Sequence, residues 1–169
     1  MRSSFIYFSW LCLTLSLSAC SVGFNFTGGN VPSNLETLFV DNFSNEAEIV
    51  VPYLGQLATE KLQDRFLTQS RLSLTSGNAD VALSGAITRY TILPTAISGQ
   101  DRAEQNRMTI AIKVNFENNQ EPNESWEQTF SGYVDFDASL DLSSVEREQI
   151  EEILEQITQD IFSKSIGKW

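Results

Sequence analysis

The thiol of Cys20 is the side chain with the most distinctive chemical context in this sequence. A cysteine can be a nucleophile, half of a disulfide, a buried apolar residue or a point of lipid attachment. Cys20 ends the stretch Leu17-Ser18-Ala19-Cys20, and an apolar run from Phe5 to Leu17 precedes it, after the single cation of Arg2. A cationic start, an apolar run and small residues at its end are typical of a secretory signal. The run is shorter than the roughly 20 residues that a membrane-spanning helix needs.

The same four residues match the lipobox of bacterial lipoproteins, which consists of leucine, two small residues and an obligatory cysteine. The lipobox implies that the thiol of Cys20 is acylated and that the chain is cut before it. Residues 1–19 are therefore predicted to be a lipoprotein signal peptide. Cys12 would leave with this signal, so the mature chain would hold no free thiol and no disulfide.

Residues 20–34 are neutral and rich in glycine, asparagine and serine, and they are predicted to form a lipidated tether. One acyl chain binds a membrane marginally, whereas two or three together anchor a protein stably. Ser21 follows the cysteine, where lipoproteins of the inner membrane often have aspartate. We therefore expect a protein that is lipid-anchored to the outer membrane and faces the periplasm.

The composition excludes several kinds of chemistry. The sequence contains no histidine, which removes Ser-His-Asp and Cys-His nucleophiles and imidazole ligands for zinc. Its formal net charge is −11, so phosphate backbones repel it and no nucleic-acid partner is expected. Carboxylate chemistry remains, and a small lipid-anchored hydrolase that uses Asp135, Asp137 and Asp141 stays open as an alternative. The favoured interpretation is a binding protein that is not an enzyme and has no cofactor.

Two groups of charged residues are candidate sites. Acidic side chains in the C-terminal segment are typical of a solvated helix face, and the aspartates of 135–141 lack the spacing of a calcium loop, so no metal site is predicted. Basic side chains gather around one loop and its flanking strands. Arginine forks suit phosphate or carboxylate groups, so this cluster is a candidate site for the anionic groups of a lipid head, with ordinary surface charge as the alternative. Its members are Arg89, Arg102, Arg107 and Lys113.

Hydrophobic periodicity predicts the elements that position these residues. Residues 37–43, 71–94, 108–116 and 126–136 are predicted to be strands, the last two with clean alternation of apolar and polar side chains. Pro94 is expected to end the second strand, and Gly77-Asn78 is a possible interruption within it. Helices are predicted from Pro52, and from a capping box at Ser143 and Glu146.

The predicted order is β-α-β-β-β-α, in a domain that covers residues 35–169. Each helix has one apolar stripe, so two helices can cover only one face of a four-stranded sheet. The fold class is therefore expected to be α+β, a two-layer sandwich with one sheet face uncovered. Polar and aromatic residues should line that face, as a solvent surface or as a docking face for another protein: Thr109, Lys113, Thr129 and Tyr133.

Three stretches of the chain carry a resemblance to a known family. They are CSVGFNFTG, LPTAISGQDRAEQNRMTIAIKVNF and SGYVDFDASLDLSSVEREQIEEILEQITQDIFSKSIGKW. Together with the lipobox and the order of elements, they resemble the LptE family of lipopolysaccharide-assembly lipoproteins, in the form found in Bacteroidota. The resemblance covers essentially the whole mature chain.

The resemblance implies a role without catalysis. A protein of this family sits as a plug inside the LptD β-barrel of the outer membrane, helps it assemble and contacts lipopolysaccharide in transit. The expected partners are therefore an LptD-like barrel, lipopolysaccharide and the membrane that holds the lipid anchor. An accessory lipoprotein of another envelope secretion or transport complex remains the alternative.

Overall fold

The structure is a computed structural model that describes residues 34–95 and 105–166. Cys20, the predicted signal peptide, most of the predicted tether and Arg102 lie outside these residues. The elements in chain order are β1 (Thr37–Val40), β2 (Ser44–Asn45), α2 (Leu54–Gln69), β3 (Ser73–Leu74), β4 (Val81–Thr95), β5 (Gln105–Asn118), a 3₁₀ turn (Pro122–Glu124), β6 (Trp126–Asp137) and α3 (Leu142–Ile166).

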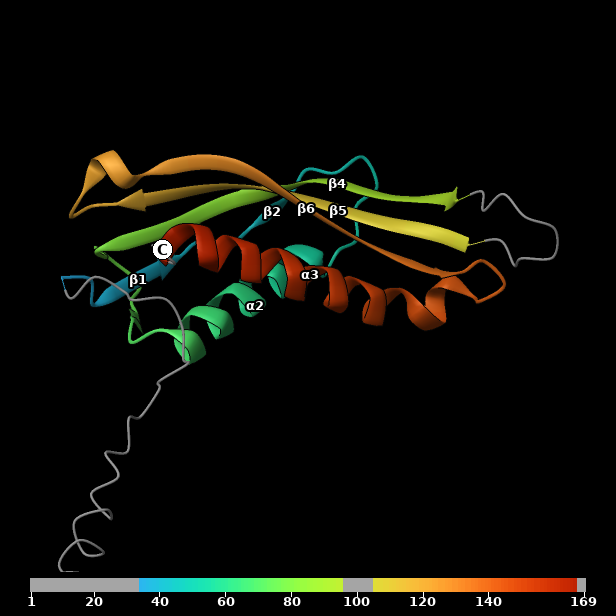
Figure 1. Ribbon diagram of the computed structural model, residues 1–169, viewed down its shortest axis with the longest axis horizontal. Coiled ribbons are helices and arrows are strands. Elements are labelled where there is room, and N and C mark those ends of the chain that lie inside the picture. Colours follow the sequence, from blue (N-terminus) through green and yellow to red (C-terminus); the bar gives the residue numbers. More distant parts are fainter. Residues whose placement is uncertain (1–33, 96–104, 167–169) are drawn as a thin grey trace, which may run out of the picture.

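The strands form one mixed sheet in the order β3-β1-β4-β5-β6, and β2 also pairs with β4. Among the three long strands, β5 is antiparallel to both β4 and β6, whereas β1 pairs in parallel with β3 and β4, and β2 pairs in parallel with β4. Both helices lie on one side of this sheet, and α3 runs along most of its length (Figure 1). The predicted α+β class, with two helices on one face, is confirmed.

The number of strands differs from the predicted four, since six strands are found in the described part of the chain. The segment 37–43 divides because β1 ends at Val40 and pairing with β4 resumes only at Ser44. The segment 71–94 divides at Gly77-Asn78, which separates the two-residue β3 from β4.

Pro94 does not end its strand as expected, because β4 continues to Thr95 and Pro94 pairs with Asn106. Beyond Ile87, β4 pairs with β5 alone among the described strands. Proline lacks the amide proton that a second neighbour would need, and an edge position tolerates this lack.

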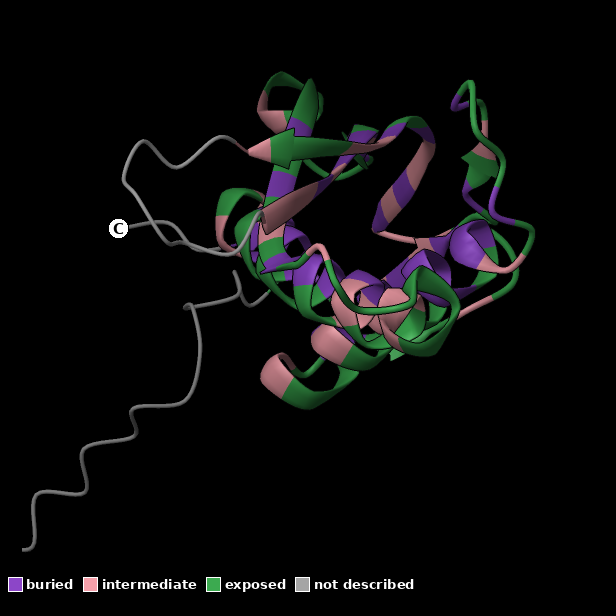
Figure 2. Ribbon diagram, turned by 90° about the vertical axis from the view of Figure 1, so that its right-hand side faces the viewer, coloured by how far each residue is buried: buried purple, intermediate pink, exposed green. Residues whose placement is uncertain are grey.

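The core lies between the sheet and the helices, where buried positions of both layers face each other (Figure 2). The apolar stripe that helical spacing predicts on each helix is buried: Leu54, Leu57, Ala58, Leu62 and Phe66 on α2, and Ile150, Ile153, Leu154, Ile157, Ile161 and Phe162 on α3. The rings of Phe66 and Phe162 meet edge to face with centroids 5.1 Å apart and join the two helices. Burial of each such side chain contributes roughly 1.5–3 kcal/mol.

Helix α3 begins one residue earlier than the predicted cap, at Leu142. The expected capping partner Glu146 has another role, because its carboxylate accepts a hydrogen bond of 2.7 Å from the hydroxyl of Tyr90. This contact fixes the start of α3 to β4. The capping box predicted from Ser143 and Glu146 is therefore wrong in its detail, although the helix is present.

Asp80 joins three segments at the other end of the sheet. Its carboxylate accepts hydrogen bonds from the backbone N–H groups of Glu36 at 3.0 Å and Thr37 at 2.9 Å, and from the amide of Gln120 at 2.7 Å. The Thr37 hydroxyl donates to it as well, at 2.8 Å. These donors stabilise the ionised form, so they lower the pKa of Asp80 far below its ordinary value. Asp80 thereby ties β1 and the connection between β5 and β6 to the start of β4.

Within the described residues, neither helix is long and apolar enough to cross a membrane.

Candidate binding face

The face of the sheet that the helices do not cover is the candidate functional site, and we call it the open face. On β5, residues that point to the helices alternate with Arg107, Thr109 and Lys113, which point away from them. Across the register, these three residues stand opposite Asp135, Tyr133 and Thr129 of β6. Thr109, Lys113, Thr129 and Tyr133 therefore share one face, as the alternation predicts.

A β-bulge brings Arg89 to the open face. Ile87 pairs with Ile112 and Arg89 with Ala111, so two steps along β4 match one step along β5. Without the bulge, Arg89 would lie on the same side as the fully buried Ile87. The extra residue shifts the alternation, so Tyr90 points to the core and Arg89 points to solvent.

Arg107 is held by two neighbours on β6. Its Nε and one terminal nitrogen donate to the two carboxylate oxygens of Asp135, each at 2.7 Å. Its guanidinium carbon also lies 4.0 Å from the centre of the Tyr133 ring, in a cation–π contact. The hydrogen bonds from Arg107 lower the pKa of Asp135 below its ordinary value, and those to Asp135 raise the pKa of Arg107.

The other described basic residues differ in their partners. Lys113 forms an ion pair of 3.0 Å with Glu127 on β6. Arg89 is exposed and makes no ion pair or hydrogen bond with any described residue. The structure thus brings three of the four predicted basic residues to one face, but it neutralises two of them. Only Arg89, of those described, presents an unpaired cation.

These residues are spread over the face and do not converge on one point. Arg89 stands opposite Ala111, two residues from Lys113 and four from Arg107 along β5. At about 3.4 Å per residue, these offsets are roughly 7 Å and 14 Å. An extended ligand with several anionic groups suits this spacing better than a single small anion does.

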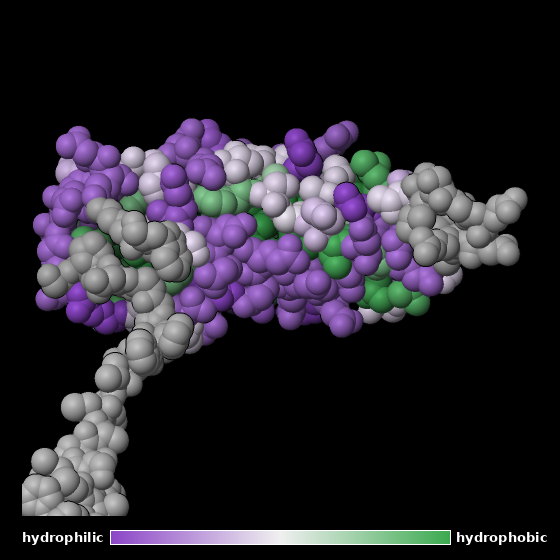
Figure 3. All heavy atoms as spheres, viewed as in Figure 1, coloured by the Kyte–Doolittle hydropathy of each residue, from purple (hydrophilic) through white to green (hydrophobic). Residues whose placement is uncertain are grey.

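Apolar side chains are exposed toward one end of the open face, where β4 and β6 end and β5 begins. Leu93 on β4 is 62% exposed and Tyr133 on β6 is 54% exposed. Leu140 and Leu142, which follow β6, are exposed as well. Hydrophobic surface is visible at this end of the molecule (Figure 3). The arginine–tyrosine contact and the exposed leucines give this end an amphipathic character.

The carboxylates considered as alternative sites do not gather. Asp135 pairs with Arg107, Asp137 accepts hydrogen bonds from Ser139, and Asp141 accepts one from Ser143. Among the described residues, no group of three or more acidic or cysteine side chains is close enough to hold a metal ion. Each of these carboxylates has a local structural partner instead.

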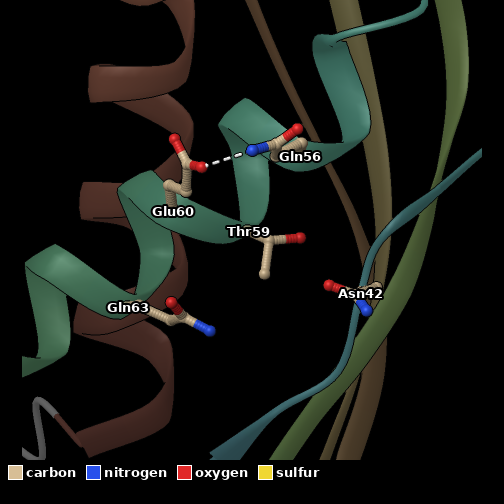
Figure 4. Close-up of a pocket in the computed structure, with 5 residues that line it drawn as sticks. All are labelled: Asn42, Gln56, Thr59, Glu60 and Gln63. Carbon is tan, nitrogen blue, oxygen red and sulfur yellow. Dashed lines mark hydrogen bonds between the residues drawn. The ribbon is translucent and has the colours of Figure 1, made fainter.

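A shallow polar hollow lies between α2 and the segment that follows β1 (Figure 4). Gln56 donates to Glu60 at 2.8 Å along one wall. The Thr59 hydroxyl accepts from the backbone N–H of Phe43 at 3.0 Å and donates to the carbonyl of Gly55 at 2.9 Å. The buried Thr59 hydroxyl therefore links α2 to the segment that follows β1, which is a structural role.

The ion pair of Arg107 with Asp135 was not predicted from the sequence, although a signal was present. Once the connection at 119–125 sets the hairpin, Phe116 stands opposite Trp126 and every later pair follows from that register. A count along both strands would have placed Arg107 opposite Asp135. No comparable signal exists for the bulge at Arg89, because the local alternation alone does not reveal an extra residue.

The arrangement is shared with solved structures of bacterial proteins. A protein from Xanthomonas campestris is similar with a TM-score of 0.57 and 14% identity, over 83% of this chain and 90% of its own. A neuraminyllactose-binding hemagglutinin homologue from Helicobacter pylori gives 0.53 and 16%, over 83% and 90%. A minor lipoprotein from Acinetobacter baumannii gives 0.51 and 12%, over 77% and 91%. At identities this low, the structural similarity shows a common fold alone.

The chain is a small two-layer α+β domain with an open sheet face, and a solved bacterial lipoprotein shares its fold. No curated protein matches the sequence. The family model of LptE, described as lipopolysaccharide-assembly, matches residues 35–165, and the chain belongs to this family. It is therefore a non-enzymatic lipoprotein of lipopolysaccharide assembly in the cell envelope, and the family resemblance seen in the sequence is confirmed.

Proposed function

We propose that this chain is the lipid-anchored partner of an LptD-like outer-membrane β-barrel and assists the assembly of lipopolysaccharide at that membrane. The family match over residues 35–165 is the observation that carries the proposal. The open face supports it, because a sheet face with exposed aromatic and apolar side chains suits protein contact. A net charge of −11 opposes anionic ligands, so docking to protein dominates over binding to lipid.

The anchor in this proposal is Cys20. Cleavage after residues 1–19 and acylation of the thiol and the new N-terminus hold the chain at the periplasmic face of the outer membrane. Residues 20–34 then form the tether, and the domain from residue 35 onward reaches the barrel. The lipobox and the polar composition of the tether support this division of the chain.

Contact with lipopolysaccharide is the second part of the proposal. Arg89 offers its guanidinium on the open face without a partner among the described residues, and Arg102 precedes β5 in the sequence. Arg107 and Lys113 are paired and contribute less to an anion site, since their carboxylate partners compete with the ligand. Anionic groups of the lipid would bind first at Arg89.

Affinity purification of the tagged, lipidated chain from outer membranes in mild detergent tests the partner. The expected result is recovery of a large LptD-like β-barrel. Recovery of a different secretion or transport complex would support the alternative accessory role and overturn this proposal. Depletion of the chain supplies a second measurement: surface lipopolysaccharide should fall, whereas normal lipopolysaccharide with a secretion defect would contradict the proposal.

A further inference from the structure

The outer edge of β6 is open along its whole length in the described part of the structure. β6 is the last strand of the sheet and has 12 residues, from Trp126 to Asp137. Its register with β5 is continuous over all of them, with no bulge. No hydrogen bond from another described segment reaches the backbone of Trp126–Phe136 on the side away from β5. Such an edge presents a row of free N–H and C=O groups.

The other edges of the same sheet are protected. The opposite edge consists of the two-residue strands β2 and β3, which are too short to template a partner. The second half of β4 has a free edge, but the bulge at Arg89 and Pro94 both interrupt it. β6 has neither a bulge nor a proline. Protein sheets avoid long, regular free edges because these edges pair with other chains, so an unprotected one points to a use.

The two sides of β6 define what could pair with it. On the open face it carries three carboxylates and no basic residue: Glu127 pairs with Lys113, Asp135 with Arg107, and Asp137 accepts hydrogen bonds from Ser139. On the helix side it carries Phe130, Val134 and Phe136, of which Val134 is only partly buried. A strand laid beside β6 would place its own alternate residues next to these two sets. The added strand is therefore favoured when it carries basic side chains on the open face and apolar side chains on the helix side.

We propose that β6 is a docking edge that adds an extended segment of a partner protein to the sheet, and that this segment alternates apolar and basic side chains. A second copy of this chain fits less well. Two-fold antiparallel pairing about the middle of β6 would place Glu127 opposite Asp135 or Asp137 of the second copy, and each copy has a net charge of −11. This inference concerns the strand edge and does not depend on the proposed barrel partner.

A peptide as long as β6 tests the proposal, with valine and lysine at alternating positions. Its binding to the full-length chain in detergent is measured by calorimetry, and the site by amide hydrogen exchange. We expect binding, with new protection of amides in β6. A peptide of alternating valine and glutamate should bind much more weakly. A valine–lysine peptide whose alternate backbone nitrogens are methylated should not bind, because it cannot complete the ladder.

Exposed positions on β6 give matched variants. The side chain of Thr129 is exposed on the open face and has no hydrogen-bond partner among the described residues, so its replacement should leave the fold intact. Thr129→Lys should weaken binding of the valine–lysine peptide by about two- to five-fold, and Thr129→Glu should strengthen it by a similar factor. Leu67→Lys makes a similar charge change on the exposed side of α2 and should have no effect.

Three results would overturn the proposal. Equal binding of the methylated peptide would mean that charge attraction alone holds the ligand. Protection confined to elements other than β6 would place the ligand elsewhere. Dimerisation of the chain that is abolished by Thr129→Pro, together with absence of peptide binding, would assign the edge to a second copy.

Discussion

Arg107 and Asp135 face each other across β5 and β6, and both N···O distances of their fork are 2.7 Å. Arg107 also covers the ring of Tyr133, so one cation joins a carboxylate and an aromatic ring on the open face. The guanidinium of Arg107 therefore holds β5 and β6 together, and its pairing with Asp135 leaves it little attraction for another anion. Among the described residues, two members of the basic cluster thus form cross-strand ion pairs, Arg107 with Asp135 and Lys113 with Glu127, and Arg89 has no such partner.

The fork predicts the titration of Asp135. Hydrogen bonds from Arg107 lower its pKa, so removal of the guanidinium in Arg107→Gln should return the pKa of Asp135 toward its ordinary value of 3.8. A pH titration of the carboxyl carbon by NMR measures this. Lys113→Gln is the matched control, since Lys113 pairs with Glu127, and it should leave Asp135 unchanged. If the pKa of Asp135 were the same in Arg107→Gln as in the parent chain, the fork would be absent in solution.

Gly55 marks a close approach between α2 and the strand layer. A Cβ at this position would lie 2.3 Å from the backbone carbonyl oxygen of Phe43. Alanine suits a helix better than glycine by about 0.5–1 kcal/mol, but this clash with backbone costs more. Gly55→Ala should lower the free energy of unfolding by about 1–3 kcal/mol in urea denaturation.

Gly77 supplies the control for that experiment. A Cβ there meets nothing within 4 Å, so Gly77→Ala should leave the stability nearly unchanged. Equal stability of both variants and the parent chain would contradict the packing of α2 against the segment at Phe43.

Asp80 predicts a loss of stability in acid. Its pKa in the folded chain is below the ordinary value of 3.8, so the carboxylate stabilises the fold fully above pH 3.8. This stabilisation disappears as the pH falls below 3.8 toward the folded-state pKa. Asp80→Asn cannot ionise and should lack this part of the pH dependence. Melting temperatures at neutral pH and near pH 3 measure this contribution. On acidification, the melting temperature of the parent chain should fall by more than that of Asp80→Asn.

The parts of the fold that were predictable are those with a strong local period. Leu54 to Phe66 and Ile150 to Phe162 repeat at helical spacing, and all the stripe residues are buried as expected. The hairpin of β5 and β6 was also visible, because its two strands alternate cleanly on either side of a turn. In both cases the signal lies within the segment itself.

The remaining features depend on contacts between distant segments. The parallel pairing of β1 with β3 and β4 joins strands of two to fifteen residues, and a two-residue strand has no period to detect. The bulge that turns Arg89 outward appears only when β4 is set against β5. For the same reason, the sequence indicated a cluster of basic residues but not which of them have acidic partners.

Cys20→Ser tests the anchor. Serine keeps the size of the side chain but lacks the thiol that the lipobox chemistry acylates, so the variant should lose its lipid and its membrane attachment. Mass spectrometry and membrane fractionation measure both. Cys12→Ser is the control, since that residue belongs to the expected signal peptide, and it should be lipidated normally. A Cys20→Ser chain that still carried acyl groups would contradict the assignment of residues 1–19 and 20–34.

Arg89→Glu tests the contact with lipopolysaccharide most cleanly. Arg89 is exposed and has no partner among the described residues, so the variant should melt at the same temperature as the parent chain. If lipopolysaccharide binds first at this guanidinium, its affinity should fall by about tenfold, as expected for loss of a charge-assisted hydrogen bond of roughly 1.5 kcal/mol. Arg107→Glu behaves differently, because the new carboxylate would face Asp135 and should lower the melting temperature. Direct binding of purified lipopolysaccharide to each variant, measured together with thermal unfolding, separates the two effects. Unchanged affinity in Arg89→Glu would remove the open face from lipid recognition and leave it to protein docking.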